Sequence, residues 1–175
     1  MGRDKAHLEW RGEAWSTRTA RLLDDLFVET LLVGGEPAPE ANGRRVPDPS
    51  GPVSALRGLV GALEAATSER VLVVATDLPK LDADLLLALT AWPESDIVVP
   101  TDEFGDHPLC AIYRRSVCLP IARENLEADR LSLRELLSRV ETDRVSLDDL
   151  GVADLGRDLL VNVNTPDELA GLEVG

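Results

Sequence analysis

The stretch from Val71 to Pro79, which reads VLVVATDLP, limits most strongly what this chain can fold into. Its first part is rich in β-branched residues and lacks the alternating polar residues of a half-exposed strand. Such a strand is typical of a parallel sheet that is covered on both faces. Asp77 follows directly, so we expect a carboxylate at the carboxyl end of a buried strand, where open α/β sheets hold their ligands. Taken alone, Asp77 fits three roles: a helix cap, a metal ligand or a general base.

The composition is that of an ordinary soluble protein. The chain has 175 residues, of which 44% are hydrophobic, and we expect a single domain over residues 1–175. No apolar run is long enough to cross a bilayer and no export signal is visible, so we expect a cytoplasmic protein with no membrane contact. The net charge of −14 argues against nucleic acid as a partner. Cys110 and Cys118 form no CxxC pair, which predicts two small buried side chains rather than a zinc site or a disulfide.

Segments with helical spacing alternate with segments typical of strands. We expect extended segments at 7–10, 28–33, 45–46, 71–75, 96–100, 143–147 and 159–163. We expect helices at 16–26, 53–66, 83–91, 117–128 and 131–140, and a helix start at 165. This alternation predicts an α/β fold with a three-layer, mostly parallel, Rossmann-like sheet. Residues 101–107 and 109–113 are interpreted as the flanks of a small antiparallel hairpin that hangs from the sheet.

Three further polar residues leave two interpretations open. Asp48 lies in the sequence PDPSGP and is either part of an acid-bearing ligand loop or only the first residue of a turn. Asn162 and Asn164 flank Val163 at the end of an expected strand. They either provide turn and cap chemistry or project two amides toward the edge of the sheet that holds ligands. Ser16 or Thr17 is the expected cap of the first helix.

Several segments together resemble the nucleotidyltransferases. The opening MGRDKA is similar to the second half of their signature, whose first half is a strand and a Gly-rich loop. PDPSGPVSALRGL resembles their acid, Gly-Pro and helix segment, and VLVVATDLPKL resembles their metal-binding strand end. DHPLCAIY and VNVNTPDEL resemble, more narrowly, segments of the molybdenum cofactor guanylyltransferases. The resemblance runs from the first residue to about Leu169.

The resemblance implies a Mg²⁺-dependent transfer of GMP from GTP to the phosphate of molybdopterin cofactor, with release of pyrophosphate. Lys5 would neutralise charge on the triphosphate, a role that suits a mobile ammonium group. Asp77 would hold the magnesium ion, because hard divalent cations prefer carboxylate oxygen. Asp48 would lie near the guanosine or the metal. GTP and the cofactor would be the partners, with transient contact to proteins that mature molybdoenzymes.

The same resemblance implies roles for six further residues. Gly34 stands where the family usually has an asparagine near the nucleotide, which leaves only backbone groups for this contact. Five residues would bind the acceptor substrate, its pterin or its phosphate: Asp106, His107, Pro108, Asn162 and Asn164. Nothing in the sequence requires a covalent nucleophile, because phosphoryl-type transfer can proceed by positioning and charge stabilisation.

The main departure from the family lies at the amino-terminus. Met1 takes the place of an internal methionine of the signature, so the first strand and its Gly-rich loop are missing from the sequence. This indicates an upstream start outside the given sequence or a truncated chain. If the chain as given is complete, we expect an open sheet edge and weakened nucleotide binding, and an added upstream strand and loop should raise the affinity for GTP. Two alternatives remain: a cytidylyltransferase that acts on a related cofactor, and a non-catalytic cofactor-binding domain.

Overall fold

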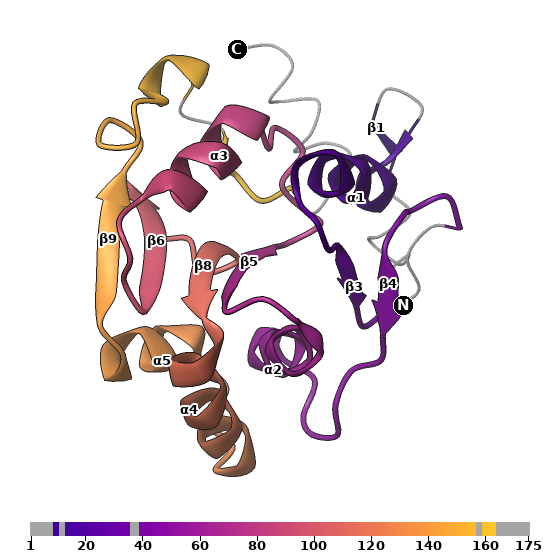
Figure 1. Ribbon diagram of the computed structural model, residues 1–175, viewed down its shortest axis with the longest axis vertical. Helices are drawn as coiled ribbons and strands as arrows, with labels where there is room; N and C mark the ends of the chain where they lie inside the picture. Colours follow the sequence, from indigo (N-terminus) through magenta and orange to yellow (C-terminus); the bar gives the residue numbers. More distant parts are fainter. Residues whose placement is uncertain (1–8, 11–12, 36–38, 157–158, 164–175) are drawn as a thin grey trace.

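A mixed β-sheet forms the centre of the molecule (Figure 1). The structure is a computed structural model and describes residues 9–10, 13–35, 39–156 and 159–163. Strand β8 (Cys110–Arg114) lies between β5 (Arg70–Val74) and β6 (Ile97–Asp102) and is antiparallel to both. Strand β9 (Thr142–Ser146) pairs in parallel with the other side of β6. Strands β5, β6 and β9 therefore run in one direction, and β8 runs against them.

A second, smaller sheet lies beside the first. It consists of β3 (Leu31–Val33) and β4 (Arg44–Val46), which are parallel to each other. The described residues contain two further pairs of short strands. Strand β7 (Gly105–Asp106) forms a tight hairpin with the end of β6, and β1 (Glu9–Trp10) pairs with β2 (Glu13–Ala14).

Helices cover both faces of the strands and give three layers. Helices α1 (Trp15–Leu26) and α3 (Ala83–Ala91) lie on one side. Helices α2 (Ala55–Ala65), α4 (Arg115–Glu127) and α5 (Leu133–Arg139) lie on the other side, and a short 3₁₀ helix spans Ala153–Leu155. The predicted α/β class with a three-layer architecture is confirmed.

Alternate residues of each central strand enter different hydrophobic cores. In β5, Val71 and Val73 face the core under α2 and α4, whereas Leu72 and Val74 face the core under α1 and α3. Because each face of the strand packs against helices, neither face has a place for polar side chains. This explains why the sequence of β5 shows no polar alternation.

Side-chain caps begin two of the helices. Ser54 Oγ accepts a hydrogen bond from the backbone N–H of Arg57 at 3.1 Å and begins α2. Asp82 Oδ1 accepts from the N–H of Asp84 at 2.8 Å and begins α3. The predicted cap of the first helix is wrong, because α1 begins at residue 15 and its N-cap position is Ala14, which makes no side-chain cap bond.

Two predictions about the strands are also wrong. Residues 109–113 do not hang from the sheet: β8 is an interior strand whose side chains on both faces are buried. The hairpin is instead formed by β6 and β7. Residues 159–163 form a turn and an irregular segment rather than a strand. Leu159 and Leu160 are buried in the core under α3, so packing, and not strand pairing, accounts for this apolar run.

Candidate functional site

Three segments that are distant in the sequence meet where β5 ends. The N–H of Ala75 donates to the carbonyl oxygen of Leu109 at 2.7 Å, which ties the end of β5 to the start of β8. The N–H of Val163 donates to the carbonyl oxygen of Asp77 at 2.9 Å. Asp77 therefore lies at the expected strand end, and both the segment before β8 and the segment that contains Asn162 lie beside it.

The turn after β3 places Gly34 against the carboxylate of Asp48. Gly34 has a φ of +66° and donates its N–H to the carbonyl oxygen of Val46 at 3.0 Å. A Cβ atom at Gly34 would lie 2.6 Å from Asp48 Oδ1, which is too close for any side chain. Asp48 Oδ2 accepts a hydrogen bond from Arg57 Nη2 of α2 at 2.8 Å. Arg57 therefore fixes the carboxylate, a role that we did not predict from the sequence.

A cavity joins these two groups of residues. Its volume is about 520 Å³, and Gly34, Gly35, Thr76 and Asp77 line it together. Two of the predicted nucleotide-binding residues, Gly34 and Asp77, thus line the cavity together, and a third, Asp48, has its carboxylate next to Gly34. A volume of this size lies within the range of small-molecule sites.

The predicted acceptor residues 106–108 lie in the hairpin beside this end. His107 Nε2 lies 2.7 Å from Asp102 Oδ2, and both side chains are largely buried. Asp106 Oδ2 accepts a hydrogen bond from Arg144 Nε at 3.0 Å. The carbonyl oxygen of Pro108 accepts a hydrogen bond from the hydroxyl of Tyr113 in β8 at 2.7 Å. These contacts hold the hairpin in place, and binding of the acceptor by its residues stays a prediction.

Of the remaining predicted site residues, the structure describes only Asn162. Asn162 is exposed next to the segment that bonds to Asp77. Lys5 and Asn164 lie outside the described residues. The structure adds Arg57 and Asp102 to the site region, and the sequence offers a weak signal for each. Arg57 stands in the first turn of a helix that follows an acidic loop, and Asp102 belongs to the same acidic turn as Asp106.

The carboxylate of Asp77 suits a metal ion that the substrate phosphates also bind. Asp77 offers carboxylate oxygen, and Mg²⁺ usually takes one or two carboxylates together with substrate phosphates and water. Among the described residues, no group of three or more His, Cys, Asp and Glu side chains could hold an ion by itself. Asp77 thus fits a magnesium ion bound to a triphosphate better than it fits a separate structural ion.

The two cysteines play no part in this site. Cys110 and Cys118 are free and buried, as expected. Burial raises the pKa of each thiol to about 12, so neither side chain provides a thiolate at neutral pH. In the part of the chain that the structure describes, no helix has the length and apolar character needed to span a membrane.

Comparison with known proteins identifies the family. The description "MobA-like NTP transferase domain" belongs to a family model that matches residues 1–145. The chain belongs to this family. A probable molybdenum cofactor guanylyltransferase of Pelotomaculum thermopropionicum is 33% identical, over 99% of this chain and 86% of the relative. A protein of Synechococcus elongatus with the same description is 29% identical, over 99% of this chain and 92% of the relative.

Solved structures agree with the fold of this MobA-like domain. Molybdopterin-guanine dinucleotide biosynthesis protein A from Archaeoglobus fulgidus superposes with a TM-score of 0.78 at 20% identity, over 99% of this chain and 90% of that chain. A 2-C-methyl-D-erythritol 4-phosphate cytidylyltransferase from Thermus thermophilus gives 0.72 at 16% identity, over 97% and 92%. The predicted resemblance is confirmed, and the MobA-like domain is a nucleotidyltransferase.

Proposed function

We propose that this MobA-like domain transfers GMP from GTP to the phosphate of molybdopterin cofactor, in the presence of Mg²⁺. Family membership supports nucleotidyl transfer in molybdenum cofactor biosynthesis. One structural observation supports the finer proposal: Asp77 and Gly34 come from separate strand ends and line one cavity, and the carboxylate of Asp48 lies next to Gly34.

The proposed reaction needs no covalent enzyme intermediate. A phosphate oxygen of the cofactor attacks the α-phosphorus of GTP and forms a new P–O bond. The bond between the α-phosphorus and the bridging oxygen breaks, and pyrophosphate leaves with the electron pair. When bound, Mg²⁺ supplies positive charge that stabilises the triphosphate oxygens.

The residues of this chain position the substrates. Asp77 would hold the metal, and Lys5 would neutralise charge on the triphosphate. Asp48, held by Arg57, would contact the guanosine or the metal. Gly34 has no side chain, so the nucleotide would approach its backbone directly, and the carboxylate of Asp48 leaves no room for a side chain at this position. Acceptor binding by the hairpin and by Asn162 and Asn164 completes the proposal.

Pyrophosphate release tests the proposal. The chain is mixed with molybdopterin cofactor, Mg²⁺ and either GTP or CTP, and Asp77→Asn is compared with the native chain. Asp129→Asn makes the same change at an exposed position after α4 and serves as the control. We expect turnover with GTP to fall at least 100-fold in Asp77→Asn and to stay unchanged in Asp129→Asn.

Each alternative predicts a different result in the same assay. Faster turnover with CTP than with GTP would favour the cytidylyltransferase, whose fold the structure shares. Cofactor binding without release of pyrophosphate from either nucleotide would favour the non-catalytic binding domain. A cytoplasmic location and transient contact with proteins that mature molybdoenzymes stay predictions.

A further inference from the structure

The hairpin of β6 and β7 rises from the edge of the sheet that holds Asp77. Leu72 of β5 and Val98 of β6 both lie opposite Ile112 of β8, so positions equally far along β5 and β6 lie at the same height. Five residues further along, β5 has led to Asp77 and β6 has led to Glu103 at the tip of the hairpin. The tip is therefore about level with the proposed metal ligand.

The hairpin also folds back toward β5. The end of β6 pairs with β9 on one side and with β7 on the other, so β7 occupies the side of β6 on which β8 and β5 lie. One to two strand spacings, roughly 5–10 Å, separate the hairpin from the line of β5. A small molecule can thus contact Asp77 and the hairpin tip at the same time.

The cavity lies on the opposite side of β5. Figure 1 shows β3 on the side of β5 that faces away from β8, and residues of β3 and β5 line the cavity together with Asp77. Under the proposed function, the nucleotide occupies this cavity. In phosphoryl-type transfer the attacking and leaving oxygens lie roughly in line with the phosphorus. An acceptor that approaches from the hairpin side therefore has the space that the nucleotide does not fill.

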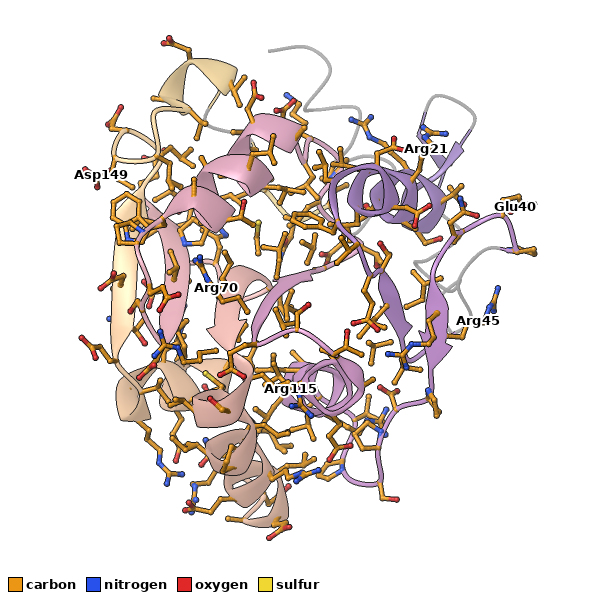
Figure 2. The ribbon with its side chains drawn as sticks, in the orientation of Figure 1. Arg21, Glu40, Arg45, Arg70, Arg115 and Asp149 are labelled. Atoms are coloured by element: carbon orange, nitrogen blue, oxygen red, sulfur yellow. The ribbon has the colours of Figure 1, made fainter. Side chains whose placement is uncertain are left out.

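The other edge of the sheet is occupied by contacts within the fold. Arg70, at the start of β5, donates to the carbonyl oxygens of Thr90 and Trp92 at 3.1 and 3.3 Å. Arg115, directly after β8, donates from Nε to the carbonyl oxygen of Leu63 at 2.7 Å. Figure 2 labels both arginines. Their guanidinium groups tie α3 and α2 to the sheet, so this edge serves the fold and the edge with the hairpin serves the substrates.

Several contacts hold the hairpin in one conformation. Asp102 Oδ1 accepts a hydrogen bond from the N–H of Phe104 at 2.8 Å, and Asp102 Oδ2 lies 2.7 Å from His107 Nε2. The N–H of His107 donates to the carbonyl oxygen of Pro100 at 2.9 Å. The ion pair of Asp106 described above holds the return strand. A side chain at this tip is presented on an ordered backbone, which lowers the entropic cost of binding.

Phe104 stands at the tip with its ring in solvent. Its exposed fraction is 73%, and among the large exposed apolar side chains that the structure describes it is the only aromatic one. It belongs to neither of the two hydrophobic cores of the described residues. Tight turns favour Gly, Asn and Asp, and Gly105 with a φ of +116° meets that need at the next position. The phenyl ring thus serves neither the core nor the turn.

We propose that Phe104 is a specificity-determining residue that stacks on the planar pterin ring of the acceptor. The inference rests on the proposed function, because it assigns the acceptor of that reaction to the hairpin. Molybdopterin cofactor carries a pterin ring at one end and a phosphate several bonds away at the other. With its phosphate beside Asp77, the ring would lie within reach of the hairpin tip. Aromatic rings prefer such offset-stacked contacts.

Two other occupants of the tip fit the observations less well. The guanine base is also planar, but under the proposed function it lies in the cavity on the other side of β5. A protein partner usually covers more than about 1,000 Å². Phe104 offers one ring between Glu103 and the carboxylates of Asp102 and Asp106, which is too small an apolar surface for such an interface.

Binding of molybdopterin cofactor to the full chain, without nucleotide, tests the inference through the change in pterin fluorescence. Phe104→Ala removes the ring, and Phe104→Trp keeps an aromatic surface. Leu87→Ala is the control, because Leu87 is an apolar side chain of α3 that is 46% exposed and does not line the cavity. We expect Phe104→Ala to bind the cofactor about fivefold or more weakly than the native chain does. Phe104→Trp and Leu87→Ala should stay within about twofold of the native affinity.

Steady-state kinetics separate a contact with the acceptor from a general structural effect. In the pyrophosphate assay, Phe104→Ala should raise KM for the cofactor by the same factor as the loss of affinity. KM for GTP and kcat should stay within about twofold, because the ring lies away from the reacting atoms. In Phe104→Trp, the added indole emission should be quenched when the cofactor binds.

The outcomes distinguish this inference from the proposed function. Equal cofactor affinity of the native chain and Phe104→Ala would overturn the inference and leave the proposed function in place. Equal losses in Phe104→Ala and Phe104→Trp would overturn it as well, because stacking tolerates another aromatic ring. Cofactor binding that depends on Phe104 without turnover of GTP would support the inference and refute the proposed function. A native chain that binds no cofactor would refute both.

Discussion

The contact between Gly34 and Asp48 leads to a quantitative prediction for Gly34→Ala. Gly34 and Gly35 both have a positive φ, +66° and +56°, so an alanine at either position adopts a left-handed conformation at a cost of about 1–2 kcal/mol. Only at position 34 does the new Cβ atom meet a neighbour, the carboxylate of Asp48 at 2.6 to 2.8 Å. At position 35 nothing lies within 4 Å. The pair of variants therefore separates backbone strain from the collision.

The collision has a defined cost because Asp48 is held in place. To make room, its carboxylate must leave Arg57, with which it forms a 2.8 Å ion pair whose side chains are 29% and 18% exposed. Loss of such a partly buried, charge-assisted hydrogen bond costs about 1–2 kcal/mol. Gly34→Ala should thus lower the free energy of unfolding by about 1–2 kcal/mol more than Gly35→Ala. In a chain of this size that difference corresponds to a Tm lower by about 2–8 °C.

Thermal and urea unfolding followed by circular dichroism measure this difference. A double variant, Gly34→Ala with Asp48→Ala, removes the atoms that collide, so the additional cost of the alanine at position 34 should disappear in that background. Equal unfolding free energies for Gly34→Ala and Gly35→Ala, within about 0.5 kcal/mol, would refute the reasoning, because the carboxylate would then move without losing its partner.

Three further predictions concern single side chains. The pKa of Glu29 is lowered to about 2, mainly by the hydrogen bond from Arg44 and then by those from Thr67. Because the folded pKa lies below the unfolded value of 4.5, the stabilisation is complete above that pH and is lost as the pH falls toward 2. Glu29→Gln should therefore lower the free energy of unfolding in urea by about 1–2 kcal/mol at pH 7 and by almost nothing at pH 2. A cost that does not change with pH would show that the hydrogen bonds from Arg44 and Thr67 to the Glu29 carboxylate do not stabilise the fold. Ser54→Ala should destabilise the chain by about 1 kcal/mol through loss of the α2 cap, whereas Ser54→Asp should retain most of that stability. Cys110 should resist iodoacetamide at pH 8 in the native chain and react once urea unfolds it, and rapid native labelling would show that the thiol is not buried.

Features with a strong local signal were predicted correctly from the sequence. The apolar run of β5 identified a doubly covered strand, and it placed Asp77 at the strand end, because the run and the acid are neighbours in the chain. Helical spacing likewise located α2 and α3 to within two residues at each end. The family resemblance was also contained in short local segments and is confirmed by the family match. The roles of the individual site residues stay predictions.

Features that depend on pairing between distant segments required the tertiary structure. The sequence of β8 shows that it is extended and apolar, but its position between β5 and β6 depends on pairing with residues 14 to 44 positions away. The contact of Gly34 with Asp48 depends on two loops that approach each other only after β3 pairs with β4. The amino-acid sequence thus determined the elements and the acid at the end of β5, because local propensity and burial are encoded along the chain. The tertiary structure alone decided the strand order and the hydrogen bonds that join Glu29 to Arg44 and Thr67, because these arise from non-local pairing.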